Sequence, residues 1–259
     1  MQPIEKADSA SFANLEGLIF DLDDTFLDHG ELRAATYQAL HELDSQGLVL
    51  VVATGRPAGW GEVLARMWPV AAVVTENGAI AHRRTEGKLL RLDGLSPSER
   101  AHTRNSLERI ASDLEQRFPE LVRTDDAHAR ISDITYDVGE YNSVPKDVVA
   151  MAVERARGLG ARTTVSSVHF HITLDQHDKA TGTLHVLRTQ FGLDTTRVRM
   201  RFGFIGDSGN DAPCFAAFPT SIAVANMSGR PSVTPRFITR GARGAGFVEA
   251  ARRILAARG

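Results

Sequence analysis

The stretch Gly17-Leu18-Ile19-Phe20-Asp21-Leu22-Asp23-Asp24-Thr25 places an apolar run directly before a cluster of carboxylates and a hydroxyl. The apolar run predicts a short buried strand, because a strand covered on both faces carries few polar side chains. Asp21 and Asp23 are two residues apart, so their side chains point the same way on an extended segment. Two such charges about 4 Å apart repel by about 4 kcal/mol at an effective dielectric constant of 20. The cluster therefore predicts a bound cation, with a solvated acidic turn as the alternative, and Mg²⁺ suits hard oxygen ligands.

Three further polar motifs stand at the ends of apolar runs or at the start of a helical stretch. Taken singly, each fits an ordinary turn or surface segment as well as a site. In open α/β sheets, however, ligands bind outside the carboxyl ends of the strands, so polar groups placed there converge on one crevice. Lys occurs at four positions in a chain with 30 Lys and Arg residues, which favours a specific use for the ammonium of Lys179. The three motifs are Thr54-Gly55-Arg56, Asp178-Lys179-Ala180-Thr181-Gly182 and Gly206-Asp207-Ser208-Gly209-Asn210-Asp211.

Strands and helices alternate near both ends of the chain. Continuous apolar strands separated by helices indicate a parallel sheet that is covered on both faces. We therefore predict an α/β protein with a Rossmann-like parallel-sheet core. Its strands are expected at 18–20, 49–53, 70–74, 198–204 and 221–225, and its helices at 31–44, 61–67, 212–218 and 246–257.

The middle of the chain has the pattern of a separate α+β unit. Residues 163–174 alternate between apolar and polar side chains, with His169 and His171 on the polar face of the predicted strand. Helices are expected at 97–118 and 148–159, and a strand at 129–138. We predict an inserted α+β cap over residues 93–176, a catalytic core formed by 17–92 and 177–259, and a flexible N-terminal tail over 1–16.

The 259-residue chain has the composition of a globular protein, with 42% hydrophobic and 24% charged residues. Its formal net charge of −2 offers no general attraction to nucleic acid or to an anionic membrane. A single cysteine, Cys214, excludes an intramolecular disulfide framework and fits a reducing compartment. The first residues lack the pattern of a secretory signal, and no apolar stretch is long enough to span a bilayer. We therefore expect a cytoplasmic protein.

The four motifs together contain the groups that a magnesium-assisted phosphoryl transfer needs. A carboxylate can attack phosphorus to form an aspartyl-phosphate, and a second one can protonate the leaving alkoxide and then activate water. A hydroxyl and an ammonium stabilise the charge on the transferring group. We assign the roles of nucleophile, acid/base, hydroxyl donor and cation to Asp21, Asp23, Thr54 and Lys179, and metal binding to Asp207 and Asp211.

The order and spacing of these motifs resemble those of the haloacid dehalogenase superfamily of phosphatases. A long segment separates the second and third motifs, as in the branch with large α/β caps. That branch includes Cof-type, sucrose-phosphatase-like and mannosyl-3-phosphoglycerate phosphatase-like proteins, and Thr75-Glu76-Asn77-Gly78-Ala79 is similar to it too. The resemblance covers nearly the whole chain past the N-terminal tail. The matching residues are Asp21-x-Asp23-x-Thr25, Ala53-Thr54-Gly55-Arg56, Lys179 and Gly206-Asp207-x-x-Asn210-Asp211.

The resemblance implies an aspartyl-phosphate mechanism and a Mg²⁺ ion. It places the ion on the Asp21 carboxylate, the Asp23 main-chain carbonyl and the Asp207 carboxylate, with Asp211 supporting the metal directly or through another ligand. An acid at Asp23 is typical of the branches that cleave phosphate esters. Asp24 departs from the family pattern, which often has Gly or Asn there. Its extra carboxylate either raises the demand for metal or faces solvent.

The cap is expected to select the substrate, a small phosphorylated metabolite for which a sugar phosphate or a sugar-phosphoglycerate is favoured. Candidate substrate contacts are Arg56, Asn77, His169 and His171. The two histidines fit a solvent-facing position equally well, and Arg56 equally fits an ion pair with an acid. The nearest alternative function is a phosphomutase like the phosphomannomutases, and one of another class is a catalytically silent sugar-phosphate sensor. We expect no nucleic-acid or membrane partner, and a monomer or homodimer.

Overall fold

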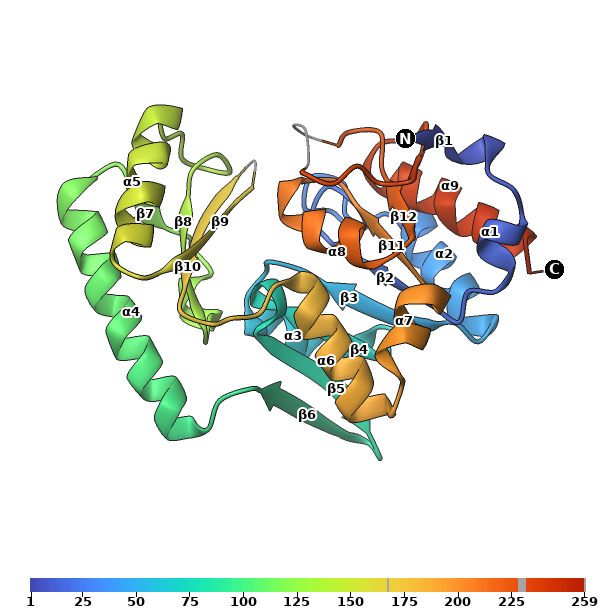
Figure 1. Cartoon of the computed structure of the whole chain (residues 1–259), viewed down its shortest axis with the longest axis horizontal. Helices are drawn as coiled ribbons and strands as arrows, with labels where there is room; N and C mark the ends of the chain where they lie inside the picture. The colour runs from blue at the N-terminus through green and yellow to red at the C-terminus, as the bar shows by residue number, and fades with distance from the viewer. Residues whose placement is uncertain (167, 228–231, 259) are drawn as a thin grey trace.

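The computed structural model describes residues 1–166, 168–227 and 232–258, and Figure 1 shows how they are arranged. Two sheets organise these residues, and we call the parts built on them the core lobe and the small lobe. The sheet of the core lobe has nine strands, which lie side by side in the order β1 (Gln2–Pro3), β13 (Phe237–Ile238), β12 (Thr220–Ala223), β11 (Phe202–Gly206), β2 (Gly17–Phe20), β3 (Val49–Ala53), β4 (Ala72–Thr75), β5 (Ile80–Thr85) and β6 (Lys88–Asp93).

The central strands of the core lobe are parallel and buried on both faces, as their apolar sequences require. Leu18 and Phe20 pack on one face of the sheet, and Ile19 between them packs on the other. Helices cover both faces, which confirms the predicted α/β fold (Figure 1). One face carries α1 (Ala10–Ala13), α2 (Ala34–Ser45), α3 (Ala58–Met67) and α9 (Arg243–Ala256), and the other carries α6 (Lys179–Phe191), α7 (Thr195–Arg201) and α8 (Ala212–Ala217).

The small lobe is an antiparallel sheet with helices on one face only. Helices α4 (Pro97–Arg117) and α5 (Lys146–Gly158) lie on the side away from the core lobe (Figure 1) and bury Tyr136, Phe170 and Ile172 of the sheet. The opposite face carries polar side chains. Among them are His171 and Thr164, which are paired on neighbouring strands and therefore lie on the same face. The strand order is β7 (Val122–Arg123), β8 (Asp133–Asp137), β10 (His169–Thr173) and β9 (Arg162–Val165).

Two of the predicted strands differ from the structure. Residues 163–174 form not one strand but the antiparallel pair β9 and β10, and Ser167 between them lies outside the described residues. The predicted strand at 198–204 is helical as far as Arg201. The side chain of Asp194 accepts a hydrogen bond from the main-chain N–H of Arg197 at 3.0 Å, which starts α7 and overrides the alternating apolar pattern that follows.

The N-terminal residues, predicted as a flexible tail, are folded against the core lobe. Strand β1 pairs with β13, and Ile4 and Phe12 are buried. The prediction was wrong because apolar residues spaced through a polar segment were not recognised as anchors. The antiparallel strands β5 and β6 were also missed, since their turn holds Glu86 at a φ of 49° rather than a typical Asn-Gly pair. The proposed division into a core and an inserted cap stays a prediction.

No helix of the described residues has the length and apolar character needed to cross a bilayer.

A buried histidine of the core lobe is expected to make folding stability fall in acid. His82 on β5 is 3% exposed, and burial lowers its pKa to about 4. The unfolded state therefore takes up a proton near pH 6.5 that the folded state takes up only near pH 4, so stability is lost as the pH falls between those values. The loss attributable to His82 is on the order of 3 kcal/mol.

Urea unfolding of the His82→Gln variant at pH 7 and pH 5 tests this expectation. Its unfolding free energy should change less between the two pH values than that of the wild type. His102→Gln, a change at an exposed residue of α4, is the control and should keep the wild-type pH dependence. An unchanged pH dependence in His82→Gln would show that His82 is not the group responsible.

Candidate active site

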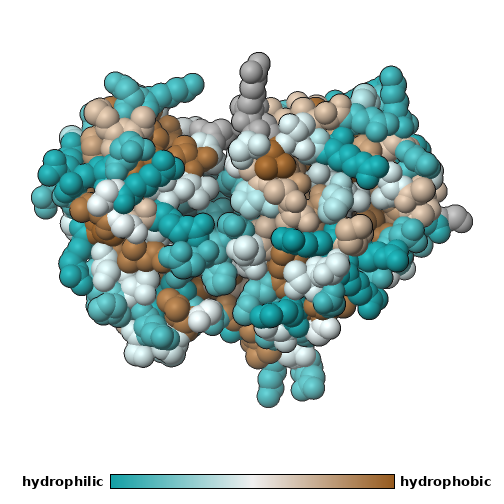
Figure 2. Space-filling view, in the orientation of Figure 1, coloured by the Kyte–Doolittle hydropathy of each residue, from teal (hydrophilic) through white to brown (hydrophobic). Residues whose placement is uncertain are grey.

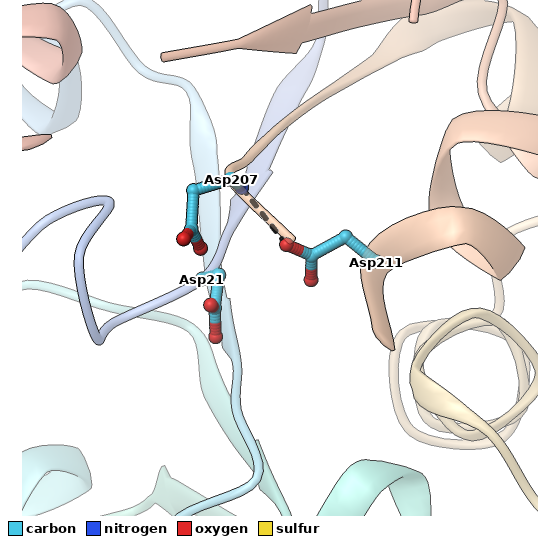
Figure 3. Close-up of side chains that lie close together, drawn as sticks. All are labelled: Asp21, Asp207 and Asp211. Carbon is cyan, nitrogen blue, oxygen red and sulfur yellow. Dashed lines mark hydrogen bonds between the residues drawn. The ribbon is translucent and has the colours of Figure 1, made fainter. Parts of the chain in front are cut away.

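The carboxyl ends of β2 and β11 bring the aspartates of two distant motifs together. The strands are parallel neighbours, and the main-chain N–H of Asp21 donates to the carbonyl of Ile205 at 3.0 Å. Asp207 follows β11, and Asp211 lies in the short helix η4 (Gly209–Asp211) beyond it. One carboxylate oxygen from each of Asp21, Asp207 and Asp211 lies within 4.8 Å of the others, and Figure 3 shows the three side chains grouped close together. All three are buried.

Lys179 completes this cluster from the start of α6. Its Nζ lies 2.8 Å from Asp21 Oδ1 and 2.8 Å from Asp211 Oδ1, and the residue is 1% exposed. Two glycines allow α6 to come this close. A Cβ atom on Gly78, whose φ is +110°, would lie 2.1 Å from the carbonyl oxygen of Asp178, and one on Gly182 would lie 2.2 Å from the carbonyl oxygen of Gly78. The first turn of α6 therefore packs directly against the main chain at Gly78. This close packing brings the Lys179 ammonium within reach of Asp21.

The cluster has more negative than positive charge and is shielded from water. Burial raises the pKa of both Asp21 and Asp207, and repulsion from Asp211 adds to the effect while Lys179 opposes it. A divalent cation would favour the ionised carboxylates instead. Hard oxygen donors in this arrangement fit Mg²⁺.

Asp211 holds the loop after β11 together. Its Oδ2 accepts hydrogen bonds from the main-chain N–H groups of Asp207 at 2.9 Å and Ser208 at 3.2 Å, while Oδ1 accepts from Lys179. Gly206 leaves room for this carboxylate, because a Cβ atom there would lie 2.5 Å from Asp211 Oδ2. Asp211 is therefore placed to orient Asp207 and Lys179.

One hydroxyl contacts this cluster, and a second lies at the end of the neighbouring strand β3. Thr25 Oγ1 donates to Asp207 Oδ1 at 3.1 Å. Thr54 is fully buried at the end of β3, and its Oγ1 accepts a hydrogen bond from the main-chain N–H of Arg56 at 3.1 Å. The hydroxyl proton of Thr54 is thus left to donate to another group, as the predicted role requires.

Arg56 forms ion pairs with acidic residues, which is one of the two roles that the sequence analysis left open for it. Its Nε and Nη2 form a forked contact with Asp23, at 2.9 Å and 2.8 Å for the shorter bonds, and Nη2 also donates to Glu140 of the small lobe at 3.3 Å. This fixes the Asp23 carboxylate, whose side chain is 32% exposed. The extra acid Asp24 is paired as well, because Arg243 Nε donates to its Oδ1 at 2.8 Å. Its carboxylate therefore neither joins the acidic cluster of Asp21, Asp207 and Asp211 nor lies free in solvent.

The two histidines of the small lobe face the aspartates across a narrow cavity. Both are buried, so the solvent-facing alternative is wrong. His169 Nε2 lies 2.8 Å from Glu140 Oε2, and His171 Nδ1 lies 2.9 Å from Asp133 Oδ2. The cavity, of about 40 Å³, is lined by residues of both lobes, which include Asp21, Asp23, Gly55, His169, His171, Asp207 and Asn210. Figure 2 shows the two lobes meeting across a hollow that is bordered largely by hydrophilic residues.

The sequence did not reveal the polar contacts that join the two lobes beside this cavity. Glu76 of the core lobe is 3% exposed and accepts hydrogen bonds from the main-chain N–H groups of Ala58, Ile131 and Ser132 at 2.9, 2.9 and 2.5 Å. Arg130 of the small lobe donates to the carbonyl of Gly55 at 3.1 Å. The motif around Glu76 was noted, but Ile131 and Ser132 lie 55 and 56 residues away and carry no local signal.

Comparisons with known proteins find similarity to hydrolases and phosphatases. The model of the haloacid dehalogenase-like hydrolase family matches residues 18–116. A phosphoglycolate phosphatase from Methanococcoides burtonii is 24% identical over 237 residues, which are 91% of this chain and 95% of that protein.

Solved structures share the fold. Protein 0175 of Thermoplasma acidophilum aligns with a TM-score of 0.73 at 17% identity, over 93% of this chain and 98% of its own. The sucrose-phosphatase from Synechocystis, solved with sucrose and phosphate, aligns with a TM-score of 0.64 at 17% identity over the same shares, 93% and 98%. The chain is therefore similar to haloacid dehalogenase-like hydrolases in the sequence of residues 18–116, and it shares its fold with solved structures over 93% of its length.

Proposed function

We propose that this protein is a Mg²⁺-dependent phosphomonoester hydrolase that acts on a small phosphorylated metabolite through an aspartyl-phosphate at Asp21. A sugar phosphate or a sugar-phosphoglycerate is the favoured substrate. The observation that carries the proposal is the position of Lys179, whose ammonium bridges Asp21 and Asp211 at 2.8 Å each. A lysine buried among three carboxylates neutralises part of their charge and provides a positive site for the transferring phosphoryl group.

The metal would be held by the carboxylates of Asp21 and Asp207, with the main-chain carbonyl of Asp23 as the third protein ligand. When bound, it would neutralise charge on the phosphoryl oxygens. Asp21 attacks phosphorus, and the phosphorus–oxygen bond to the leaving group breaks as the new bond forms. The Thr54 hydroxyl and the Lys179 ammonium donate to the phosphoryl oxygens and stabilise them during transfer.

Asp23 carries the proton in both halves of the reaction. It gives a proton to the leaving alkoxide, and it then takes one from the water that hydrolyses the aspartyl-phosphate. The forked contact with Arg56 holds Asp23 in one orientation at the rim of the cavity. Because Arg56 also contacts Glu140, the placement of this acid depends on the small lobe, which we propose is the substrate-selecting cap.

Phosphate release from p-nitrophenyl phosphate and from a panel of hexose phosphates tests the proposal. Phosphate should appear in the presence of Mg²⁺, disappear when EDTA is added, and return when Mg²⁺ is restored, because the buried aspartates need a cation to act as ligands and nucleophile.

The outcomes separate the three functions. Full activity in EDTA would contradict a role for the acidic cluster in metal binding. An isomeric sugar phosphate formed without release of phosphate would identify a phosphomutase. Binding of a hexose phosphate without any turnover would identify a silent sensor.

A further inference from the structure

A second polar cavity adjoins the catalytic one. It has a volume of about 300 Å³, at the lower end of the range for small-molecule pockets. Asn210 lines both cavities, and Lys179 of the catalytic cluster lines the second. The walls come from both lobes, with Asn77 and Pro213 of the core lobe facing strand β9 of the small lobe.

The lining of this cavity differs in charge from that of the catalytic one. Around the catalytic aspartates, Arg56, Arg130 and Arg243 are each already paired with carboxylates. In the second cavity, Arg162 Nη1 donates to the main-chain carbonyls of Asp175 and His177, both at 3.2 Å, and the structure records no carboxylate paired with it within the described residues. Two neutral contacts thus orient an exposed guanidinium that has other N–H donors available for a ligand.

Neutral polar groups accompany this guanidinium. Thr164 lies on the same face of the sheet as His171, toward the core lobe. The Oδ1 atom of Asn77 is buried and has no hydrogen-bond partner among the described residues, which is costly unless a donor reaches it. Asp178 is the carboxylate of the lining, and it is engaged as the cap of α6 by the main-chain N–H of Thr181 at 2.8 Å. The cavity therefore offers an acceptor for a hydroxyl and a cation for an anionic group.

We propose that this cavity binds the leaving group of the substrate, and that the substrate is a phosphorylated hydroxy acid, with its carboxylate on Arg162 and a hydroxyl on Asn77. The inference rests on the proposed phosphatase activity and narrows its substrate class. A phosphate at Lys179 and a carboxylate at Arg162 place the two anionic ends of one small molecule on two cations that both line this cavity. A neutral sugar alcohol of the same length leaves Arg162 without its partner.

Matched substrate pairs test the proposal, because each pair differs only in a carboxylate or a primary alcohol. The pairs are 3-phosphoglycerate with glycerol 3-phosphate, and 6-phosphogluconate with sorbitol 6-phosphate. In at least one pair, wild-type kcat/KM should be about tenfold or more higher for the acid, as expected for one charge-assisted hydrogen-bonded contact. Arg162→Gln should remove that preference, and Arg162→Lys should keep part of it because the charge is retained.

Arg66→Gln is the matched control, since Arg66 lies on α3 in an exposed pair with Glu62 and should leave the acid-to-alcohol ratio unchanged. Equal or better turnover of the alcohols in both pairs, or an unchanged ratio in Arg162→Gln, would overturn the proposal. Failure to hydrolyse p-nitrophenyl phosphate would instead contradict the phosphatase activity itself.

In that case, calorimetric binding of 6-phosphogluconate and sorbitol 6-phosphate tests whether the cavity prefers the acid. Tighter binding of the acid that is lost in Arg162→Gln supports the subsite, and equal binding overturns it.

Discussion

Replacing Asp21 by Asn is expected to reduce turnover by about four orders of magnitude or more, because a carboxamide is not a nucleophile toward phosphorus. The side chain keeps its size, and its amide oxygen still accepts from Lys179, which lies 2.8 Å from Asp21 Oδ1. The fold should therefore survive, and the thermal unfolding midpoint should stay close to that of the wild type. Phosphate release measured under single-turnover conditions gives the activity.

The neighbouring acid provides a matched control for this variant. Asp24 lies on the same loop, but its carboxylate is held by Arg243 at 2.8 Å. Asp24→Asn should therefore lose less than about tenfold in kcat. Mass spectrometry must exclude deamidation of the introduced asparagine back to aspartate. An intact Asp21→Asn protein that turns over at a rate near the wild type would remove Asp21 from the mechanism.

The convergence of the strand-end motifs could be predicted from the sequence, because the apolar run before each motif shows where a strand ends. Asp21, Thr54 and Asp207 each come directly after an apolar strand, and parallel strands end at one edge of the sheet. The close approach of Lys179 depends on Gly78 and Gly182, whose pairing no local pattern reveals. It was the family resemblance and the order of motifs that placed this lysine at the site.

The surroundings of the site could not be predicted in the same way. Asp24 and Arg243 are 219 residues apart, and His171 meets Asp133 only because β8 and β10 pair in a particular register. Glu140 contacts both Arg56 and His169 from a loop that has no recognisable motif. These partners depend on how the lobes pack, so the single sequence left Arg56 and the two histidines with two roles each.

Replacing Lys179 by Met is expected to cost both activity and stability. Without the ammonium, the buried carboxylates of Asp21, Asp207 and Asp211 repel one another with no opposing charge, or must take up protons. Removing one partner from a buried ion cluster costs about 3–5 kcal/mol, and we expect the unfolding free energy at neutral pH to fall by that amount when no divalent metal is present. Turnover should fall by about 10³ or more, because the transferring group loses its cation.

Magnesium separates the two parts of this effect. Because a divalent ion binds the folded cluster and not the unfolded chain, Mg²⁺ should restore part of the stability of Lys179→Met while leaving its turnover low. Denaturant unfolding with EDTA and with Mg²⁺, beside an activity assay, measures both. Lys88→Met is the control, since Lys88 is an exposed residue of the edge strand β6 and its loss should change neither quantity appreciably. Wild-type stability of Lys179→Met in EDTA would show that the ammonium does not balance the buried aspartates, and the charge argument for the site would then fail.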